Sequence, residues 1–242
     1  MLVVGCQRSG TTHLERLFRA DPRSHVFSEF SALSIAPDKT VWRPLDDVVD
    51  MLEGCGGRYS VARSLLSSHN TARILDALPG SVAVWMYREA DPVVRSMLRK
   101  WPGDFQSISE RVESLPDGTW ELRSFWDEVH AYARENAQGN QSDTLADLYA
   151  AFWYLRNRSF FDLGLSNDPR VLLISYETLT RDPKGTLERI LSHGGIPRPR
   201  VTFPMQTRSP RPRGARTPIL SPAIQEACHR LYADLRAAEA GG

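Results

Sequence analysis

Apolar residues gather in three short runs, at residues 2–5, 81–87 and 170–177. Nearly continuous apolar runs of this length are typical of parallel strands that are buried on both faces. Each run leads into a segment whose apolar positions recur at helical spacing. This alternation of strands and helices predicts a doubly wound α/β fold, in which a parallel sheet flanked by helices is the middle of three layers.

The same patterns predict the remaining elements. Residues 25–30 have the alternation of a short strand or extended segment. Asp91 followed by Pro92 predicts a helix start, with Asp91 as the N-cap. Helices are predicted at residues 11–18, 41–52, 60–78, 93–101, 121–136, 144–163, 183–193 and 223–238, with a loop rich in proline and arginine at residues 197–222.

The turn after the first apolar run has a glycine at each end, Gly5 and Gly10, with four residues between them. Small residues at this spacing let successive backbone N–H groups wrap around an anion. The helix that begins at Thr11 adds unpaired N–H groups and the positive end of its dipole. The sequence therefore predicts an oxyanion-binding loop. A loop that binds a nucleoside triphosphate has a lysine at the position of Thr11. Here the cation is Arg8, inside the loop.

The composition of the chain argues against several classes of protein. The 242 residues are 41% hydrophobic, which suits one α/β domain over residues 1–242. Thirty basic and 29 acidic residues give a formal charge of +1, so the overall charge does not indicate nucleic-acid binding. The three cysteines are widely spaced, which argues against a disulfide framework or a metal site and favours a cytoplasmic location. No apolar run is long enough for a membrane span, and we expect a soluble protein.

The loop at residues 7–12, Gln-Arg-Ser-Gly-Thr-Thr, resembles the 5′-phosphosulfate loop of sulfotransferases that use 3′-phosphoadenosine 5′-phosphosulfate (PAPS). Arg88 and Ser96, eight residues apart, are similar to the pair that holds the 3′-phosphate in that family. Tyr176, in a Tyr-Glu-x-Leu segment followed by a proline, resembles the family's tyrosine near the adenine. The loop at residues 197–222 resembles a nucleotide lid, and its candidate contacts are Arg211, Arg213 and Gly214.

The resemblance implies a soluble, bacterial-type sulfotransferase with a P-loop-like fold that moves a sulfuryl group from PAPS to a hydroxyl or amine. The acceptor class is a small molecule, a lipid or a sugar, and no metal is expected. Arg8 would stabilise the leaving phosphate. Glu29 is the candidate general base, and His69 is the alternative. The loop residues expected to bind the donor are Arg8, Ser9, Gly10, Thr11 and Thr12.

Two other function classes remain open. A P-loop kinase acting on a small molecule would need magnesium, and a nucleotide-binding module without catalysis would not turn over PAPS. Thr11 in the lysine position disfavours the kinase. So does the lack of an aspartate at the ends of the second and third strands, which end in Arg88 and in residues 175–177. Arg8 and Glu29 count against the module. We expect a small-molecule acceptor as partner, with no nucleic acid and no stable membrane association; the sequence leaves the oligomeric state open.

Overall fold

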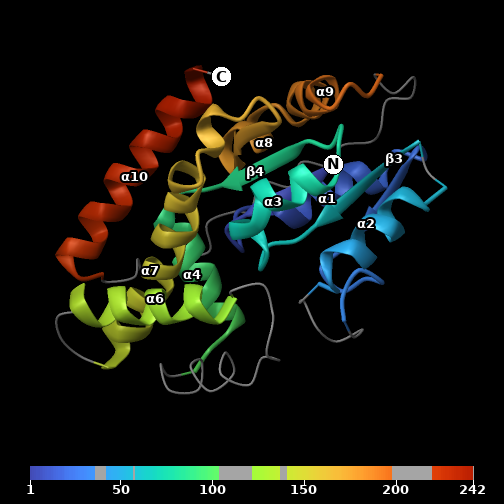
Figure 1. The fold of residues 1–242 in the computed structure, drawn as a ribbon. Helices are drawn as coiled ribbons and strands as arrows, with labels where there is room; N and C mark the ends of the chain where they lie inside the picture. Colours follow the sequence, from blue (N-terminus) through green and yellow to red (C-terminus); the bar gives the residue numbers. More distant parts are fainter. Residues whose placement is uncertain (36–41, 57, 104–121, 137–140, 198–219, 242) are drawn as a thin grey trace.

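One parallel sheet organises the protein. The computed structural model describes residues 1–35, 42–56, 58–103, 122–136, 141–197 and 220–241. All strand pairs are parallel, and the strand order is β2-β3-β1-β4-β5 (Figure 1). The predicted α/β class and parallel sheet are therefore confirmed. The strands are β1 (Leu2–Gly5), β2 (Ser24–Phe27), β3 (Tyr59–Arg63), β4 (Ala83–Tyr87) and β5 (Val171–Ser175).

Helices connect and cover the strands. No helix among the described residues is long and apolar enough to cross a membrane. Two short 3-10 turns, η1 (Ser68–Asn70) and η2 (Leu165–Asn167), interrupt the connections. The helices are α1 (Thr11–Arg19), α2 (Leu45–Glu53), α3 (Thr71–Ala77), α4 (Ala90–Lys100), α6 (Leu122–Asn136), α7 (Gln141–Asp162), α8 (Tyr176–Arg181), α9 (Pro183–His193) and α10 (Pro222–Gly241).

The sheet separates two apolar cores, because successive side chains of a strand point to opposite faces. On one face, Leu2 and Trp85 pack with α2, α3, α4, α6, α7 and α10. On the other face, Val3 and Val84 pack with α1, α8 and α9. The result is the predicted three-layer arrangement. Figure 1 shows α10 (red) on the opposite side of the molecule from α2 and β3.

The prediction of a helix over residues 60–78 is wrong in its first part. Residues Tyr59–Arg63 form β3, which pairs with β1 on one side and β2 on the other. Val61 and Leu65 lie four residues apart, as in a helix, but Val61 and Ala62 are buried on opposite faces of the sheet. Pairing with two neighbouring strands therefore overrides the local pattern. Only Thr71–Ala77, at the end of the predicted range, form a helix.

Two predicted boundaries also change. Tyr176 was expected in the third strand, but β5 ends at Ser175 and Tyr176 begins α8. The Ser175 side chain accepts a hydrogen bond from the Thr178 N–H, so it caps the new helix. Asp91 is not an N-cap, because α4 already begins at Ala90. Both changes lie at the carboxyl ends of β4 and β5, beside the predicted site, and Tyr176 stays at this edge of the sheet.

A buried carboxylate near the end of α10 attaches this helix to the sheet. Glu239 accepts hydrogen bonds from the Ser175 N–H at 3.0 Å and from the Tyr87 hydroxyl at 2.6 Å. Burial acts to raise the pKa of Glu239, but the hydrogen bonds from Ser175 and Tyr87 outweigh it and the pKa is lowered. The ionised form of Glu239 thus stabilises the fold.

We predict that Glu239→Ala lowers the free energy of unfolding by about 1–3 kcal/mol, because it leaves the Ser175 N–H and the Tyr87 hydroxyl unpaired. A carboxylate with a lowered folded-state pKa contributes stability above its unfolded pKa and loses it as the pH falls through the folded pKa. The variant and the wild type should therefore converge in acid. Urea unfolding at several pH values measures this difference.

The matched control is Glu226→Ala on the same helix, since Glu226 is exposed and forms a surface ion pair with Arg230. It should cost no more than about 0.5 kcal/mol. Equal losses for the two variants would contradict an anchoring role for Glu239.

Candidate functional site

The backbone between β1 and α1 forms the predicted anion-binding loop. Gly5, Arg8 and Gly10 have φ values of 114°, 67° and 91°, and Arg8 is the only described non-glycine residue with a positive φ. Such left-handed residues turn successive N–H groups toward one point. The Ser68 hydroxyl accepts a hydrogen bond from the Gly5 N–H at 2.9 Å, which fastens the loop to η1. Thr11 begins α1, so the helix N-terminus faces the same point.

Tyr176 packs directly on this loop. A Cβ atom at Gly10 would lie 2.3 Å from the Tyr176 ring, so only glycine fits there. The Arg88 guanidinium lies over the Tyr176 ring, 4.2 Å from its centroid. The start of α8 thus joins the loop to the carboxyl end of β4.

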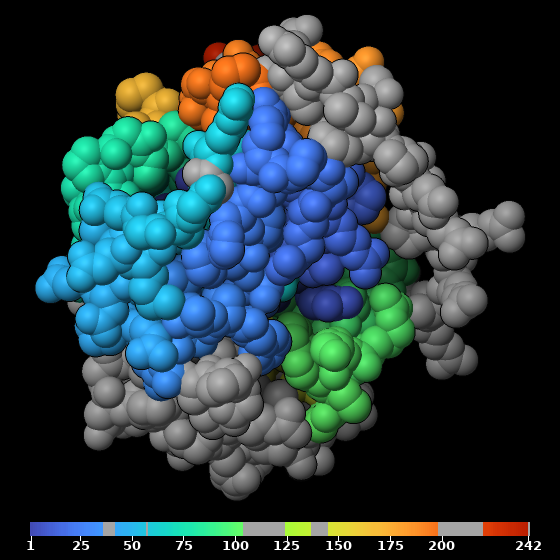
Figure 2. Space-filling model, turned by 90° about the vertical axis from the view of Figure 1, so that its right-hand side faces the viewer, coloured from blue at the N-terminus to red at the C-terminus, as the bar shows by residue number. Residues whose placement is uncertain are grey.

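Arg8 reaches from the loop to α4, and its Nε donates a hydrogen bond to the Ser96 hydroxyl at 2.9 Å. Figure 2 shows the N-terminal segment (blue) meeting the α4 region (green) at the surface. Burial is the main cause that lowers the pKa of Arg8, followed by the positive charges of Arg99 and Arg88. The guanidinium groups of Arg99 and Arg88 therefore lie close enough to repel that of Arg8, and a bound anion would relieve this repulsion.

Arg88 has a nitrogen available for such an anion. Its Nε–H is buried and has no hydrogen-bond partner among the described residues. The carboxylate of Glu177 is 3.9 Å away, which makes an ion pair but no hydrogen bond. A phosphate oxygen would satisfy this donor with a charge-assisted bond.

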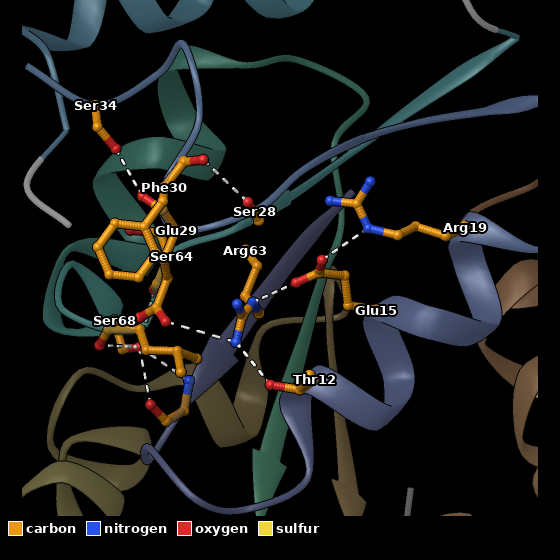
Figure 3. Close-up of polar contacts among 12 residues, drawn as sticks. Thr12, Glu15, Arg19, Ser28, Glu29, Phe30, Ser34, Arg63, Ser64 and Ser68 are labelled. Carbon is orange, nitrogen blue, oxygen red and sulfur yellow. Dashed lines mark hydrogen bonds and ion pairs between the residues drawn. The ribbon is translucent and has the colours of Figure 1, made fainter. Parts of the chain in front are cut away.

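Glu29 follows β2 and is largely buried, with 14% of its side chain exposed. Its carboxylate lies 3.5 Å from NH1 of Arg63, which also donates to the Thr12 hydroxyl at 3.1 Å (Figure 3). Burial raises the pKa of Glu29, and the charge of Glu15 raises it further, while Arg63 and Arg8 act in the opposite direction. Glu29 is therefore a carboxylate with increased proton affinity beside the loop.

His69 lies in η1 and has a different environment. NH1 of Arg156 lies 3.2 Å from its Nδ1, and the imidazole stacks on Phe125 with a centroid distance of 6.0 Å. A guanidinium can only donate, so Nδ1 accepts from Arg156, while Nδ2 of Asn70 lies 3.2 Å from Nε2. A second proton on His69 would place a cation beside the fully buried Arg156.

The structure thus brings most of the predicted site residues to one edge of the sheet. Ser9 and Thr11 are buried within the loop and at the start of α1. His69 lies in the turn behind the loop. Arg211, Arg213 and Gly214 lie outside the described residues. The residues gathered at the carboxyl ends of the strands are Arg8, Ser9, Gly10, Thr11, Thr12, Glu29, Arg88, Ser96 and Tyr176.

Sequence reasoning missed three charged residues of this edge. Arg63 was assigned to a helix, although it ends a parallel strand beside the loop. Glu15 has the position of an ordinary helix residue, and only its contact with Arg63 reveals its place. Arg99 lies three residues after Ser96 on α4, a spacing that places both on one helix face and was available in the sequence.

Within the described residues, no group of three or more His, Cys, Asp or Glu side chains is arranged to hold a metal ion. The charges that surround the loop are supplied by arginine instead. Chemically, the site can bind an anion with several negative charges and accept a proton on a carboxylate nearby.

Comparison with solved structures places the fold. A sulfotransferase from Alicyclobacillus acidocaldarius is 17% identical with a TM-score of 0.56, over 98% of this chain and 92% of that one. The sulfotransferase domain of the Synechococcus PCC 7002 olefin synthase is 16% identical with a TM-score of 0.52, over 99% and 92%. No curated protein sequence matches the chain. These similarities show a P-loop-like sulfotransferase fold.

A family model described as "Sulfotransferase family" matches residues 1–200. The matched region contains every described residue of the site, from the loop after β1 to Tyr176 in α8. Because the match spans most of the 242 residues, the chain belongs to the sulfotransferase family.

Proposed function

We propose that the protein transfers the sulfuryl group of PAPS to a hydroxyl or amine of a small-molecule, lipid or sugar acceptor. In this reaction the bond between sulfur and the 5′-phosphate oxygen breaks, and a bond from sulfur to the acceptor forms. The acceptor proton passes to a base. The products are the sulfated acceptor and 3′-phosphoadenosine 5′-phosphate (PAP). We also propose that residues 1–242 form one domain; residues 198–219 of the predicted nucleotide lid (197–222) lie outside the described residues.

The arginine cluster carries this proposal. A donor with phosphates at both the 3′ and 5′ positions needs two anion-binding sites at the same edge of the sheet. The loop N–H groups and Arg8 supply one, while Arg88 and Ser96 supply the other. The hydrogen bond from Arg8 to Ser96 joins these two groups of residues, which supports adjacent binding of the two phosphates. Tyr176 lies between Gly10 and Arg88, so its ring is suitably placed to border a nucleotide.

Arg8 is assigned to the leaving group. Negative charge increases on the 5′-phosphate as the bond to sulfur breaks. Donors that are already oriented stabilise such charge without reorganisation, and their effect is larger in a site that excludes water. The guanidinium of Arg8, oriented by its hydrogen bond to Ser96, and the N–H groups at the start of α1 are donors of this kind.

Glu29 is assigned as the general base. A base is most effective when its pKa lies near the working pH, and burial moves the pKa of Glu29 in that direction. His69 is less suitable, because both of its ring nitrogens already face nitrogen atoms of other side chains, Nδ1 that of Arg156 and Nε2 that of Asn70. The geometry therefore supports Glu29 over His69.

The proposal is tested by incubating the purified protein with PAPS carrying a radiolabelled sulfuryl group, in EDTA, together with panels of hydroxyl and amine acceptors. Label in an acceptor without added metal is the expected result. Transfer that occurs only from ATP and only with magnesium would replace the proposal with the kinase.

Arg88→Ala should weaken PAP binding about 10- to 100-fold, because the 3′-phosphate loses a charge-assisted hydrogen bond. Binding of adenosine 5′-phosphate, which lacks the 3′-phosphate, should hardly change. Calorimetric titration of both nucleotides measures the difference. Lys100→Ala, which removes an exposed charge at the end of α4, is the control and should leave both affinities intact. An equal loss for both nucleotides in Arg88→Ala would remove the 3′-phosphate assignment.

Glu29→Gln should reduce kcat about 10²- to 10⁴-fold, the usual contribution of a positioned base, without weakening PAP binding. His69→Gln should retain most of the activity. Steady-state kinetics and PAP titration of both variants separate the two candidates. Full activity of Glu29→Gln together with an inactive His69→Gln would transfer the role of base to His69.

A further inference from the structure

Arg63 contacts three side chains of the candidate site at once. Its Nε lies 2.6 Å from Oε2 of Glu15, and its NH1 donates to the Thr12 hydroxyl at 3.1 Å. The same NH1 lies 3.5 Å from Oε2 of Glu29. Figure 3 shows the guanidinium between these three partners. Because β3 runs beside β1, the residue that ends β3 is placed next to the loop and the first turn of α1.

Two carboxylates lie against the same guanidinium in this cluster. Glu15, Arg63 and Glu29 have side-chain exposures of 9%, 11% and 14%, so one guanidinium serves two largely buried carboxylates. The sharing is unequal, since the ion pair is short to Glu15 and long to Glu29. Glu15 is also paired with Arg19 at 2.8 Å. Glu29 is thus the carboxylate whose charge is less neutralised.

Building on the proposed sulfuryl transfer, we propose that Glu15 and Arg63 are positioning residues of the reaction: Glu15 anchors the Arg63 guanidinium, which bridges the Thr12 hydroxyl and the Glu29 carboxylate. The anchor prevents Arg63 from forming a short, direct ion pair with Glu29. Glu29 therefore keeps the proton affinity that a base needs, while Arg63 still fixes its orientation.

The bridge also orients Thr12 toward the donor. A guanidinium has no acceptor, so the Thr12 oxygen accepts from Arg63. The hydroxyl proton of Thr12 is then left to donate to an oxygen of the bound phosphosulfate. One arginine thereby connects the group that binds the donor with the group that takes the acceptor proton.

The charged groups around Glu29 come from three parts of the site, and each shifts the pKa of Glu29. Arg63 comes from β3, Glu15 from α1 and Arg8 from the loop, while the backbone N–H of Leu65 adds a hydrogen bond. Burial raises the pKa of Glu29 most strongly, Glu15 adds to it, and the two arginines oppose it. Substitution of Glu15 and substitution of Arg63 must therefore shift the pKa of Glu29 in opposite directions.

The test is a direct titration of Glu29 in the full chain by carbon NMR of side-chain-labelled glutamate, with Glu29→Gln identifying the signal. Glu15→Gln keeps the shape of the side chain but removes its charge and releases Arg63 toward Glu29. We expect the pKa of Glu29 to fall by about one unit. Arg63→Gln removes the opposing cation, and we expect the pKa to rise. The acidic limb of the kcat profile should move in the same directions.

Arg19→Gln is the matched control, because it removes an exposed ion pair of Glu15 and leaves the anchor in place. It should move neither the titration nor the kcat profile. Thermal unfolding verifies that each variant is folded. If Arg63→Gln does not fold, the fall in the pKa of Glu29 in Glu15→Gln is sufficient to test the inference.

An unchanged Glu29 titration in Glu15→Gln would overturn the inference. A shifted titration with an unchanged kcat profile would also overturn it, since the network would then not act on the reaction. The titration requires no turnover. Absence of PAPS turnover in the wild type would therefore contradict the proposed function separately, while the NMR signal still decides whether Glu15 and Arg63 control Glu29.

Discussion

The position of β1 between β3 and β4 is the constraint on which the site depends. Parallel pairing on both sides brings the carboxyl ends of three strands to one edge of the sheet. β1 leads into the predicted anion-binding loop, β3 ends in Arg63 and β4 in Tyr87, with Arg88 directly after it. Ligands of open α/β sheets bind at this edge. The order of the strands therefore determines which side chains lie close together at this edge.

Charge is distributed unevenly along this edge. Arg8, Arg88 and Arg99 are grouped where the donor phosphates are proposed to bind, and desolvation followed by the charges of Arg99 and Arg88 lowers the pKa of Arg8. On the other side of the loop, Arg63 is shared between Glu15 and Glu29. One side thus favours an anion and the other favours a proton, which are the two requirements of transferring a charged group to a hydroxyl.

Much of this arrangement could be predicted from sequence because its signals are local. The apolar run at residues 2–5 and the spacing of Gly5 and Gly10 lie within a dozen residues, and Arg88 and Ser96 are separated by one strand-to-helix turn. The assignment of residues 60–63 failed for the opposite reason. This strand is stabilised by pairing with β1 and β2, which are distant in the sequence. The pattern within a short stretch of sequence therefore could not reveal it.

The contacts of Glu15 and Arg63 could not be predicted for the same reason. Glu15 resembles any polar residue of a helix, and its partner lies 48 positions away in a strand that the local pattern hides. The roles of the remaining site residues rest on the family resemblance and on the geometry that joins them. The loop, Arg88 and Ser96 together lead to the central claim that the site is built for a 3′,5′-bisphosphate.

Calorimetric titration of the wild-type protein with PAP, in EDTA and alongside ATP, tests that claim most directly. We predict tight binding of PAP and weak binding of ATP, because the two anion sites match the 3′- and 5′-phosphates and Thr11 replaces the lysine that a triphosphate needs. Preference for ATP, or binding of neither nucleotide, would contradict the account.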